Sequence, residues 1–211
     1  MNDELNSILE KVQVLYHKYG IKSITMDDVS RELGISKKTL YQYVVDKTDL
    51  VNKVLELEVS NRNLEFNLCT GSEKNAIEEM VDVHWYLNKM MKEYNPSTDY
   101  DLKKYYPDLY RKYHESRRKK MYEKVLSNIR KGKKQGLYRM ELNEEIIAKL
   151  TILRAESIID NEIYNTSEFT SKRYFMELII FHIRGIANQE GIKVLEKNIK
   201  KFELLNDDLI S

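Results

Sequence analysis

The feature that most constrains the fold is the scarcity of residues that break a helix. The chain has only two prolines and seven glycines among 211 residues, and 33% of its residues are charged. Sheets with many turns need more glycine and proline, whereas long helices need few. Val, Ile and Thr occur, but no series of short alternating strands separated by turn residues is found. The sequence therefore predicts an all-α fold.

The sequence also bears on the compartment in which the chain works. Cys69 is its single cysteine, so no disulfide can form within the chain and a reducing compartment is expected. The start, "MNDELNSILE", lacks the basic region of a signal peptide. The apolar run "YFMELIIFHI" is interrupted by Glu177 and His182, and no run approaches the roughly 20 residues of a spanning helix. We expect a soluble, cytoplasmic protein with no membrane partner.

Four helices are predicted in the front part of the chain. Ile8, Val12, Leu15 and Tyr19 form one apolar stripe, and Gly20 follows it as a helix terminator. Thr25, with Asp28 three residues later, has the pattern of a capping box. Ser36 and Asp46 are further N-cap candidates. Together these signals predict helices over about residues 2–19, 26–33, 37–44 and 47–68.

The segment "CTGSEKN" is predicted to be a hinge before the rear part of the chain. Apolar periodicity predicts rear helices over about residues 74–94, 99–105, 107–131, 144–164 and 169–190, with a last helix after Gly191. Pro107 suits the first position of its helix, where no N–H is needed. We expect a front domain over residues 1–55 and a rear domain over residues 56–211.

Residues 26–44 have the pattern of a helix-turn-helix, in which two short helices are joined by a turn at Gly34 and Ile35. Leu40 and Val44 are expected to face inward, together with Val29, Leu33, Ile35 and Leu50. The second helix of such a motif lies in the DNA major groove. Its outward residues are expected to be Lys37, Lys38, Thr39, Tyr41, Gln42 and Tyr43.

These outward side chains have the chemistry that DNA recognition needs. Lysine can donate to guanine, glutamine can pair with adenine, and threonine or tyrosine hydroxyls can bind phosphates. Lys47 combines a cation with the free N–H groups of a helix start, which suits a phosphate. The alternative, an exposed polar helix in an ordinary bundle, is about equally compatible with the pattern alone, because short helix pairs are common.

From about residue 8 to residue 55 the sequence resembles the DNA-binding domain of the TetR family of bacterial transcriptional regulators. The resemblance rests mainly on "LGISKKTLYQY", with Gly20, Lys47 and Leu50. Three positions depart from the family pattern. Lys38 stands where glycine is frequent, Gln42 where histidine is frequent, and Val44 where phenylalanine is usual. Lys38 and Gln42 fall at variable base-reading positions, so they bear on which operator is read.

The rear part resembles the family more weakly, in "RKGKKQGLYRMELNEE" and "FHIRGIANQEG". The resemblance implies nine or ten helices, a homodimer formed through the last long helices, and a double-stranded operator of near-palindromic sequence. It also implies a small-molecule effector bound in the rear domain. The DNA-binding residues expected from the chemistry and the resemblance are Thr25, Lys37, Lys38, Thr39, Tyr41, Gln42, Tyr43 and Lys47.

No enzymatic or metal-binding motif is found. The sequence lacks a P-loop, a G-x-G-x-x-G motif and a G-x-S-x-G motif. The four histidines, His17, His84, His114 and His182, are far apart, and "HESRR" lacks the second histidine of H-E-x-x-H. We expect no catalysis, no metal and no cofactor.

Several rear residues are candidates for the effector site, although an ordinary core role is the commoner explanation for most of them. Methionine and aromatic side chains make adaptable pocket walls, and a lone tryptophan often lines a cavity. The candidates are Trp85, Met90, Tyr94, Tyr110, His114 and Arg154. His182, on the expected dimer face, is better explained as a core or interface histidine.

Arg154 is the sharpest of these candidates, because it shares the inward face of Ile147 and Ile158. A buried guanidinium needs an anion. A structural partner such as Glu156 or Asp160 is favoured over the carboxylate of a bound effector, but both explanations stay open.

The segment of residues 103–139 carries 14 Lys and Arg against three Asp and Glu. Such a run is usually a solvated helix face. An alternative is that residues 117–120, "RRKK", add long-range attraction to DNA.

The sequence is thus interpreted as a homodimeric regulator, most simply a repressor released by an effector. The alternative is a helical module that binds a small molecule or a protein, with a front domain that is only structural. The cations Lys37, Lys38 and Lys47 argue against that alternative.

Overall fold

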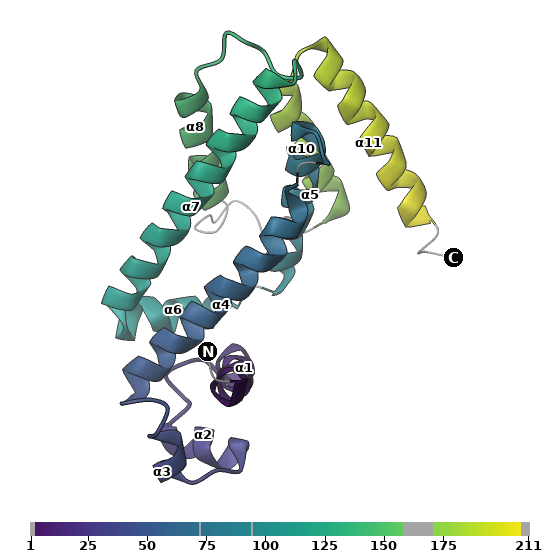
Figure 1. The fold of residues 1–211 in the computed structure, drawn as a ribbon. Helices are drawn as coiled ribbons and strands as arrows, with labels where there is room; N and C mark the ends of the chain where they lie inside the picture. Colours follow the sequence, from purple (N-terminus) through teal and green to yellow (C-terminus); the bar gives the residue numbers. More distant parts are fainter. Residues whose placement is uncertain (1–2, 72, 94, 158–170, 208–211) are drawn as a thin grey trace. The chain divides into compact units, whose positions relative to one another are not determined.

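The computed structural model describes residues 3–71, 73–93, 95–157 and 171–207. The described elements are all helices, which confirms the predicted all-α class (Figure 1). They are α1 (Asp3–Tyr19), α2 (Met26–Leu33), α3 (Lys37–Leu40), α4 (Lys47–Cys69), α5 (Ala76–Glu93), α6 (Pro96–Tyr105), α7 (Pro107–Lys134), α8 (Glu144–Ser157), α10 (Lys172–Ile186) and α11 (Gln189–Asp207).

Two compact units make up the chain. The first contains residues 1–65 and 94–117, and the second contains residues 66–93 and 118–211. The boundary predicted at residue 55 lies inside α4, whose last turn belongs to the second unit, and α7 is likewise divided between the units. Helix α6, expected to belong to the rear, is part of the first unit.

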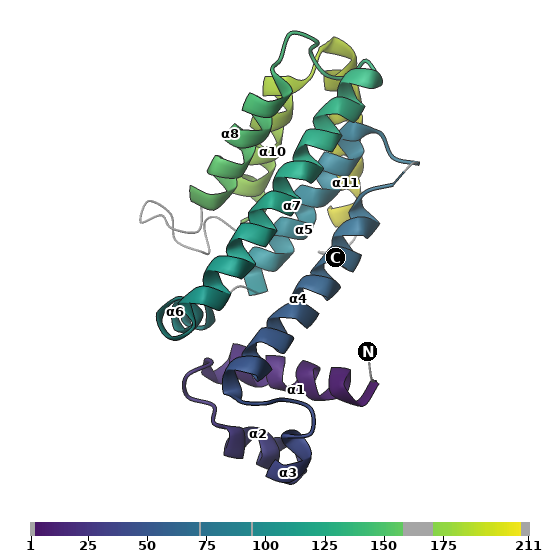
Figure 2. The same ribbon diagram turned by 60° about the vertical axis from the view of Figure 1, so that its left-hand side comes forward.

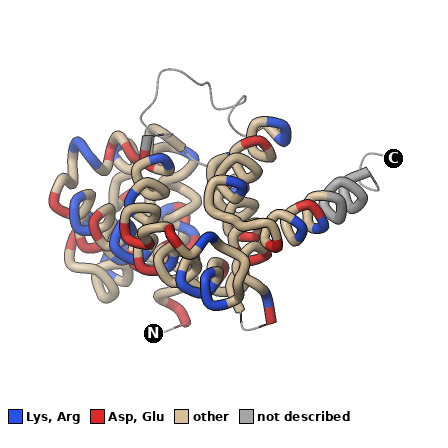
Figure 3. The backbone as a smooth tube through the Cα atoms, turned by 90° about the horizontal axis from the view of Figure 1, so that it is seen from above, with Lys and Arg blue, Asp and Glu red and all other residues tan. Residues whose placement is uncertain are grey.

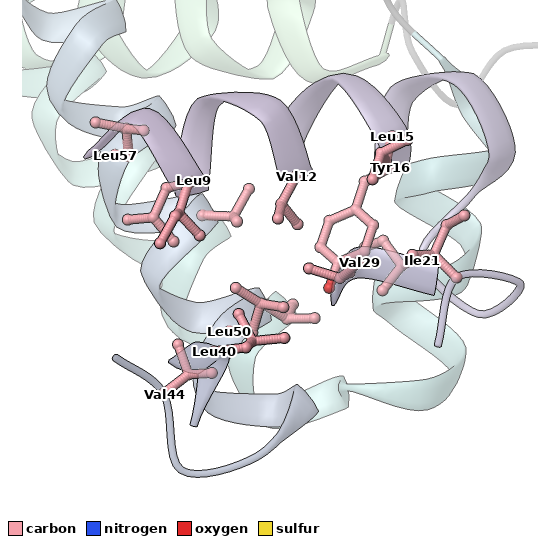
Figure 4. Close-up of a cluster of buried hydrophobic side chains, with 14 of the residues drawn as sticks. Leu9, Val12, Leu15, Tyr16, Ile21, Val29, Leu40, Val44, Leu50 and Leu57 are labelled. Carbon is pink, nitrogen blue, oxygen red and sulfur yellow. The ribbon is translucent and has the colours of Figure 1, made fainter. Parts of the chain in front are cut away.

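The core of the first unit is built by α1 to α4 with α6 and the start of α7. Figure 4 shows side chains from α1, α2, α3 and α4 directed toward a common centre. The predicted inward residues Val29, Leu40, Val44 and Leu50 are all buried, and Leu33 and Ile35 pack against them half-buried. Val44, which stands where the family usually has phenylalanine, is still 98% covered, since its exposed fraction is 2%.

The helix starts in this unit follow the predicted caps. The Thr25 hydroxyl accepts from the Asp28 N–H at 3.2 Å, and the Asp28 carboxylate accepts from the Thr25 N–H at 3.0 Å, which completes a capping box. Ser36 caps α3 through the Thr39 N–H at 3.0 Å, and Asp46 caps α4 through the Asp49 N–H at 2.8 Å. These bonds satisfy donors that a helix start otherwise leaves unpaired.

The second unit encloses its own core between α5, α10 and α11 (Figure 2). Ile77 on α5, Ile179 and Ile183 on α10 and Leu195 on α11 are all fully or almost fully buried. Residues 137–139, after α7, join the α10–α11 junction through backbone bonds, from the Arg139 N–H to the Ile186 carbonyl and from the Asn188 N–H to the Leu137 carbonyl.

A buried carboxylate in this unit accepts three hydrogen bonds. Glu79 is 6% exposed and accepts from the Lys131 ammonium at 2.7 Å, the Asn128 amide at 3.2 Å and the Gly71 N–H at 3.0 Å. The Tyr138 hydroxyl donates to the Asn128 carbonyl oxygen at 3.0 Å, and burial raises the pKa of Tyr138 well above its ordinary value. A buried charge is tolerated only with such bonds, so this network ties α5 to α7.

The predicted rear helices agree with α5, α6, α7, α8, α10 and α11 to within a few residues at most ends. Tyr94, Ile158 and Asp160 lie outside the described residues, as do the end of the predicted 144–164 helix and the start of the predicted 169–190 helix.

Gly132 provides the test of packing in the second unit. Its position is helical, and a Cβ there would overlap the ring of the fully buried Tyr138. We expect Gly132→Ala to lower the free energy of unfolding by about 2 kcal/mol or more, because either the ring or α7 must shift. Urea denaturation followed by circular dichroism measures this change.

Gly71→Ala is the matched control, because nothing lies within 4 Å of a Cβ at Gly71 and its backbone is compatible with alanine. It should change the free energy of unfolding by less than about 1 kcal/mol. Equal stability of the two variants would contradict the described packing.

Candidate DNA-binding and ligand-binding residues

The turn between α2 and α3 is fixed by its backbone. Gly34 has φ +67°, and its N–H donates to the Arg31 carbonyl at 3.2 Å, while the Ile35 N–H donates to the Ser30 carbonyl at 3.0 Å. Glycine reaches this left-handed conformation at little cost, whereas a side chain there would be strained. The two helices of the motif therefore meet at a defined angle.

Helix α3 is shorter than predicted, since it covers Lys37–Leu40 and not residues 37–44. The chain nevertheless continues to wind after it. The Gln42 N–H donates to the Thr39 carbonyl and the Tyr43 N–H to the Leu40 carbonyl, both bonds spanning three residues. We refer to residues 36–44 as the recognition segment.

Four of the predicted DNA-binding residues are exposed on the recognition segment. Lys37 forms an ion pair with Asp27 of α2, so part of its charge is offset. Lys38 is exposed and forms no ion pair among the described residues. Tyr41 is 49% exposed and Gln42 is exposed beside it. The surface thus presents lysine, tyrosine and glutamine together.

Two other predicted residues on this segment are half-buried. Thr39 lies against the cap, where its hydroxyl and that of Ser36 are 2.8 Å apart. Tyr43 packs on the core of the first unit, and a hydrogen bond with Glu4 of α1 raises the pKa of its hydroxyl. Tyr43 therefore helps to hold the segment on α1.

Lys47, at the start of α4, is half-buried. Its ammonium donates to the Lys22 carbonyl at 3.1 Å. Burial lowers the pKa of Lys47, and the carboxylates of Asp101 and Asp28 oppose that shift. Thr25, the last of the predicted DNA-binding residues, caps α2 as described above. The side chains of Thr25 and Lys47 are therefore engaged within the protein while they stay partly accessible.

The contacts that α6 makes with α1 could not be predicted from the sequence. The Lys22 N–H, just after α1, donates to the Asp101 carboxylate at 2.8 Å. The Thr98 hydroxyl donates to the Tyr16 carbonyl at 3.2 Å, and the Asn95 amide donates to the His17 carbonyl. Helix α6 thereby caps the carboxyl end of α1 and holds the loop that leads to α2.

The structure does not bring all the predicted effector residues together. Tyr110 and His114 belong to the first unit, where their ring centroids are 4.0 Å apart and the His114 Nε2 is 3.4 Å from an Asp99 oxygen. Trp85, Met90 and Arg154 belong to the second unit, and Tyr94 is not described.

Trp85 and Arg154 lie near two histidines, His84 and His182, whose proximity was not predicted from the sequence. Trp85 packs against Phe175 of α10, with ring centroids 4.6 Å apart and ring planes inclined by 52°. The rings of His84 on α5 and His182 on α10 are 5.7 Å apart, and both side chains are buried. His182 thus points into the core of the second unit and not outward from it, because it shares the face of Ile179 and Ile183.

Burial controls the protonation of this pair. It lowers the pKa of His84 to about 4, partly offset by a hydrogen bond with the Met80 carbonyl at 2.7 Å. It also lowers the pKa of His182 well below its ordinary value, and the Arg154 guanidinium adds to both shifts. Burial likewise lowers the pKa of Arg154 itself. Both histidines are therefore neutral at pH 7.

Comparison with known proteins shows which families and structures the chain resembles. Residues 8–54 match the model of the bacterial regulatory proteins of the tetR family. An uncharacterized HTH-type transcriptional regulator of Bacillus subtilis strain 168, YvaF, is 25% identical over 169 residues, which are 80% of this chain and 88% of the relative.

Solved structures of similar fold include a transcriptional regulator from Cytophaga hutchinsonii, with a TM-score of 0.71 and 18% identity over 89% of this chain and 100% of that one. A TetR-family regulator from Streptomyces coelicolor gives a TM-score of 0.68, with 15% identity over 86% of this chain and 94% of that one. Residues 8–54 thus match the DNA-binding domain of the tetR family, and the chain as a whole is similar to transcriptional regulators.

The TetR family match covers the whole helix-turn-helix, from α1 into α4. None of the described helices is long and apolar enough to cross a membrane. No group of three or more His, Cys, Asp and Glu side chains in the described ranges is arranged to hold a metal ion.

The basic segment of residues 103–139 is extensively paired. Arg118 bonds Glu156 at 2.7 Å, Arg130 bonds Glu144 at 3.0 Å and Lys131 bonds Glu79 at 2.7 Å. Figure 3 shows that basic and acidic residues alternate along much of the described chain. The arginines of the first two pairs are largely exposed, as expected on a solvated helix face, whereas Lys131 belongs to the buried network of Glu79.

The low pKa of His84 predicts a loss of stability in acid. Below pH 6.5 the unfolded chain protonates His84, whereas the folded chain resists protonation down to about pH 4. The free energy of unfolding should therefore fall as the pH drops through this window, by roughly 3 kcal/mol from this group. Urea denaturation at pH 7, 6 and 5 measures the slope.

The variant His84→Gln should show a shallower slope, because it removes the group that titrates. Leu87→Met, an apolar exchange on the same helix, should keep the slope of the unchanged protein. Identical slopes in all three proteins would show that His84 is not protected from protonation.

Proposed function

We propose that the chain is a homodimeric repressor that binds a near-palindromic operator and is released by a small-molecule effector. The observation that carries this proposal is that the recognition segment has one buried apolar side and one exposed polar side. Leu40 and Val44 are buried in the core, while Lys37, Lys38, Tyr41 and Gln42 face outward. A segment anchored in this way can enter a major groove without losing its shape.

The exposed residues divide by chemistry into base readers and phosphate binders. Lys38 can donate to guanine and Gln42 can pair with adenine, and both are exposed. The Tyr41 hydroxyl and the ammonium of Lys37 suit phosphate oxygens, and Thr39 can add a hydroxyl. Base readers give specificity, whereas phosphate binders set the register.

Lys47 and Thr25 are assigned to the phosphates that flank the groove. Each lies at the N-terminal end of a helix, where backbone N–H groups and the helix dipole favour an anion. The bond from Lys47 to the Lys22 carbonyl holds the ammonium in place before DNA arrives. Tyr43, packed on the core, is assigned a supporting position at the edge of this surface.

A second copy of the chain is the proposed partner of α8 and α10. We define the apolar face as Ile146, Leu150 and Leu153 of α8 with Phe181 of α10, whose exposed fractions run from 54% to 77%. The α8 residues are spaced by four and three, so they form one stripe. Exposed apolar groups of this kind mark interaction sites. Two-fold symmetry would bring the same face of each copy together and give two recognition segments.

The effector is proposed to bind in the second unit, near Trp85 and Met90. Both α4 and α7 contain residues of both units, so a change in the second unit can reach the first through a continuous helix. The dimer is proposed to have two conformations that differ in the spacing of its recognition segments. An effector that binds one of them more tightly shifts the equilibrium toward that conformation, by the difference between its two binding free energies.

The first test is selection of genomic DNA fragments by the purified full-length protein. We expect recovery of a near-palindromic site. Lys38→Ala and Gln42→Ala should each relax the base preference at one position per half-site, by roughly 1–3 kcal/mol of discrimination. Sequencing of the selected fragments measures the preference.

Lys103→Ala, on α6, is the control for the loss of one lysine from the first unit. It should leave every base preference unchanged. Weak binding that falls with salt, selects no sequence and is the same in all variants would contradict the proposal.

The apolar face has its own test. Leu150→Glu with Phe181→Glu should abolish the dimer, because each copy would bury two unpaired charges. Light scattering coupled to gel filtration should show a monomer, with an increase of about 100-fold or more in the dissociation constant of the dimer.

Met140→Glu replaces another exposed apolar residue of the second unit that lies outside α8 and α10. This control should remain a dimer. A double variant that dimerises normally would assign the interface to another surface.

A further inference from the structure

The chain between the recognition segment and α4 is held by two side chains of α4 itself. The Lys53 ammonium donates to the Tyr43 carbonyl at 3.0 Å. The Asp49 carboxylate accepts from the Val45 N–H at 2.9 Å, through the oxygen Oδ2. That same oxygen is 2.6 Å from the Lys53 ammonium, so the bonds form one continuous chain from residue 43 to residue 45. We call Asp49 and Lys53 the exit clamp.

The two clamp residues are well placed to act together. They are four residues apart on α4, a spacing that puts two side chains on the same face of a helix. Their side chains are only 26% and 30% exposed. The hydrogen bond from Lys53 lowers the pKa of Asp49, so the carboxylate is charged at neutral pH. Hydrogen bonds between charged groups are the stronger kind, and partial burial protects them from screening.

The clamp acts where the chain has left the regular α-helix. Helix α3 ends at Leu40, and the Tyr43 N–H donates to the Leu40 carbonyl across three residues. Beyond this turn a helix no longer supplies partners for its own backbone groups. The side chains of Lys53 and Asp49 supply them instead, one for a carbonyl and one for an N–H.

The clamp and the hydrophobic core restrain the segment in different ways. Leu40 and Val44 are 0% and 2% exposed, and they determine which side of the segment faces the core (Figure 4). Apolar packing has no direction of its own, whereas a hydrogen bond requires the donor to point at its acceptor. Because Tyr43 and Val45 are both bonded to the clamp, the backbone is held on each side of the buried Val44.

The two ends of the recognition segment therefore have separate anchors. Lys38 lies at the first end, where the Ser36 hydroxyl accepts from the Thr39 N–H at 3.0 Å. Gln42 lies at the second end, is exposed and directly precedes the clamped Tyr43. A side chain that reads a base with two hydrogen bonds must be placed within about 0.5 Å of its ideal position. At Gln42 that precision depends on the backbone that follows it.

We propose that Asp49 and Lys53 are positioning residues for base recognition, which hold Gln42 in the orientation that it needs in the major groove. This inference rests on the proposed function, because it gives α4 a role in the base preference of the recognition segment. The clamp residues need not touch DNA, since they act through the backbone of residues 43–45.

Selection of DNA fragments by the full-length protein tests the base preference. The variants Gln42→Ala and Lys38→Ala first identify the base that each side chain reads. Lys53→Met removes the ammonium and keeps most of the side-chain length. It should relax the preference at the base of Gln42 about fivefold and leave the base of Lys38 unchanged. Lys53→Arg should restore the preference, because a guanidinium can donate to both the carbonyl and the carboxylate.

Amide hydrogen exchange, followed by NMR without DNA, tests the positioning directly. Lys53→Met and Asp49→Ala should each speed the exchange of the amides of residues 43–45 by about fivefold or more, because this part of the chain opens more often. The matched control is Arg111→Met, which breaks an ion pair with Asp108, 3.1 Å away on α7 in the same unit. It should behave as the unchanged protein in both experiments, and circular dichroism checks that each variant is folded.

The proposal is overturned if Lys53→Met changes neither base preference or relaxes both alike, or if residues 43–45 exchange as slowly in it as in Arg111→Met. A uniform loss of DNA affinity with a smaller salt dependence and unchanged exchange would make Lys53 a phosphate contact, which also overturns it. If the unchanged protein selects no sequence, the proposed function fails and the role in base reading fails with it. The exchange rates would still show whether the clamp fixes the segment, so the two failures are distinguishable.

Discussion

The burial of Leu40 is the contact on which the recognition segment depends. A helix of four residues is too short to be stable in isolation. Its position comes from Leu40 and Val44, which insert between α1, α2 and α4 against Val29 and Leu50. Because that side of the segment is fixed, the opposite side presents Lys38 and Gln42 in one orientation. In the proposed function, specificity for a base sequence would therefore rely on hydrophobic packing that touches no DNA.

Local signals in the sequence were sufficient for most of the first unit. Thr25, Ser36 and Asp46 cap the helices that follow them, and Gly34 adopts the left-handed conformation, because each of these features depends on neighbouring residues alone. The length of α3 was predicted wrongly for the opposite reason. Its periodicity continues to Val44, but the chain tightens into bonds that span three residues before α4 begins.

Contacts between distant segments could not be predicted in the same way. The bond from Asp101 to the Lys22 N–H joins residues 79 apart, and the pairing of His84 with His182 depends on how α5 and α10 pack. An isolated histidine on an apolar stripe gives no indication of its neighbour. From the sequence, Arg154 was predicted to lie on an inward face. The carboxylate of a bound effector was one of the two kinds of partner considered for it. The assignments of individual DNA-contacting and effector-binding residues remain predictions.

The two proposed sites are connected by thermodynamics whatever path joins them. If the effector weakens operator binding by some factor, operator DNA must weaken effector binding by the same factor.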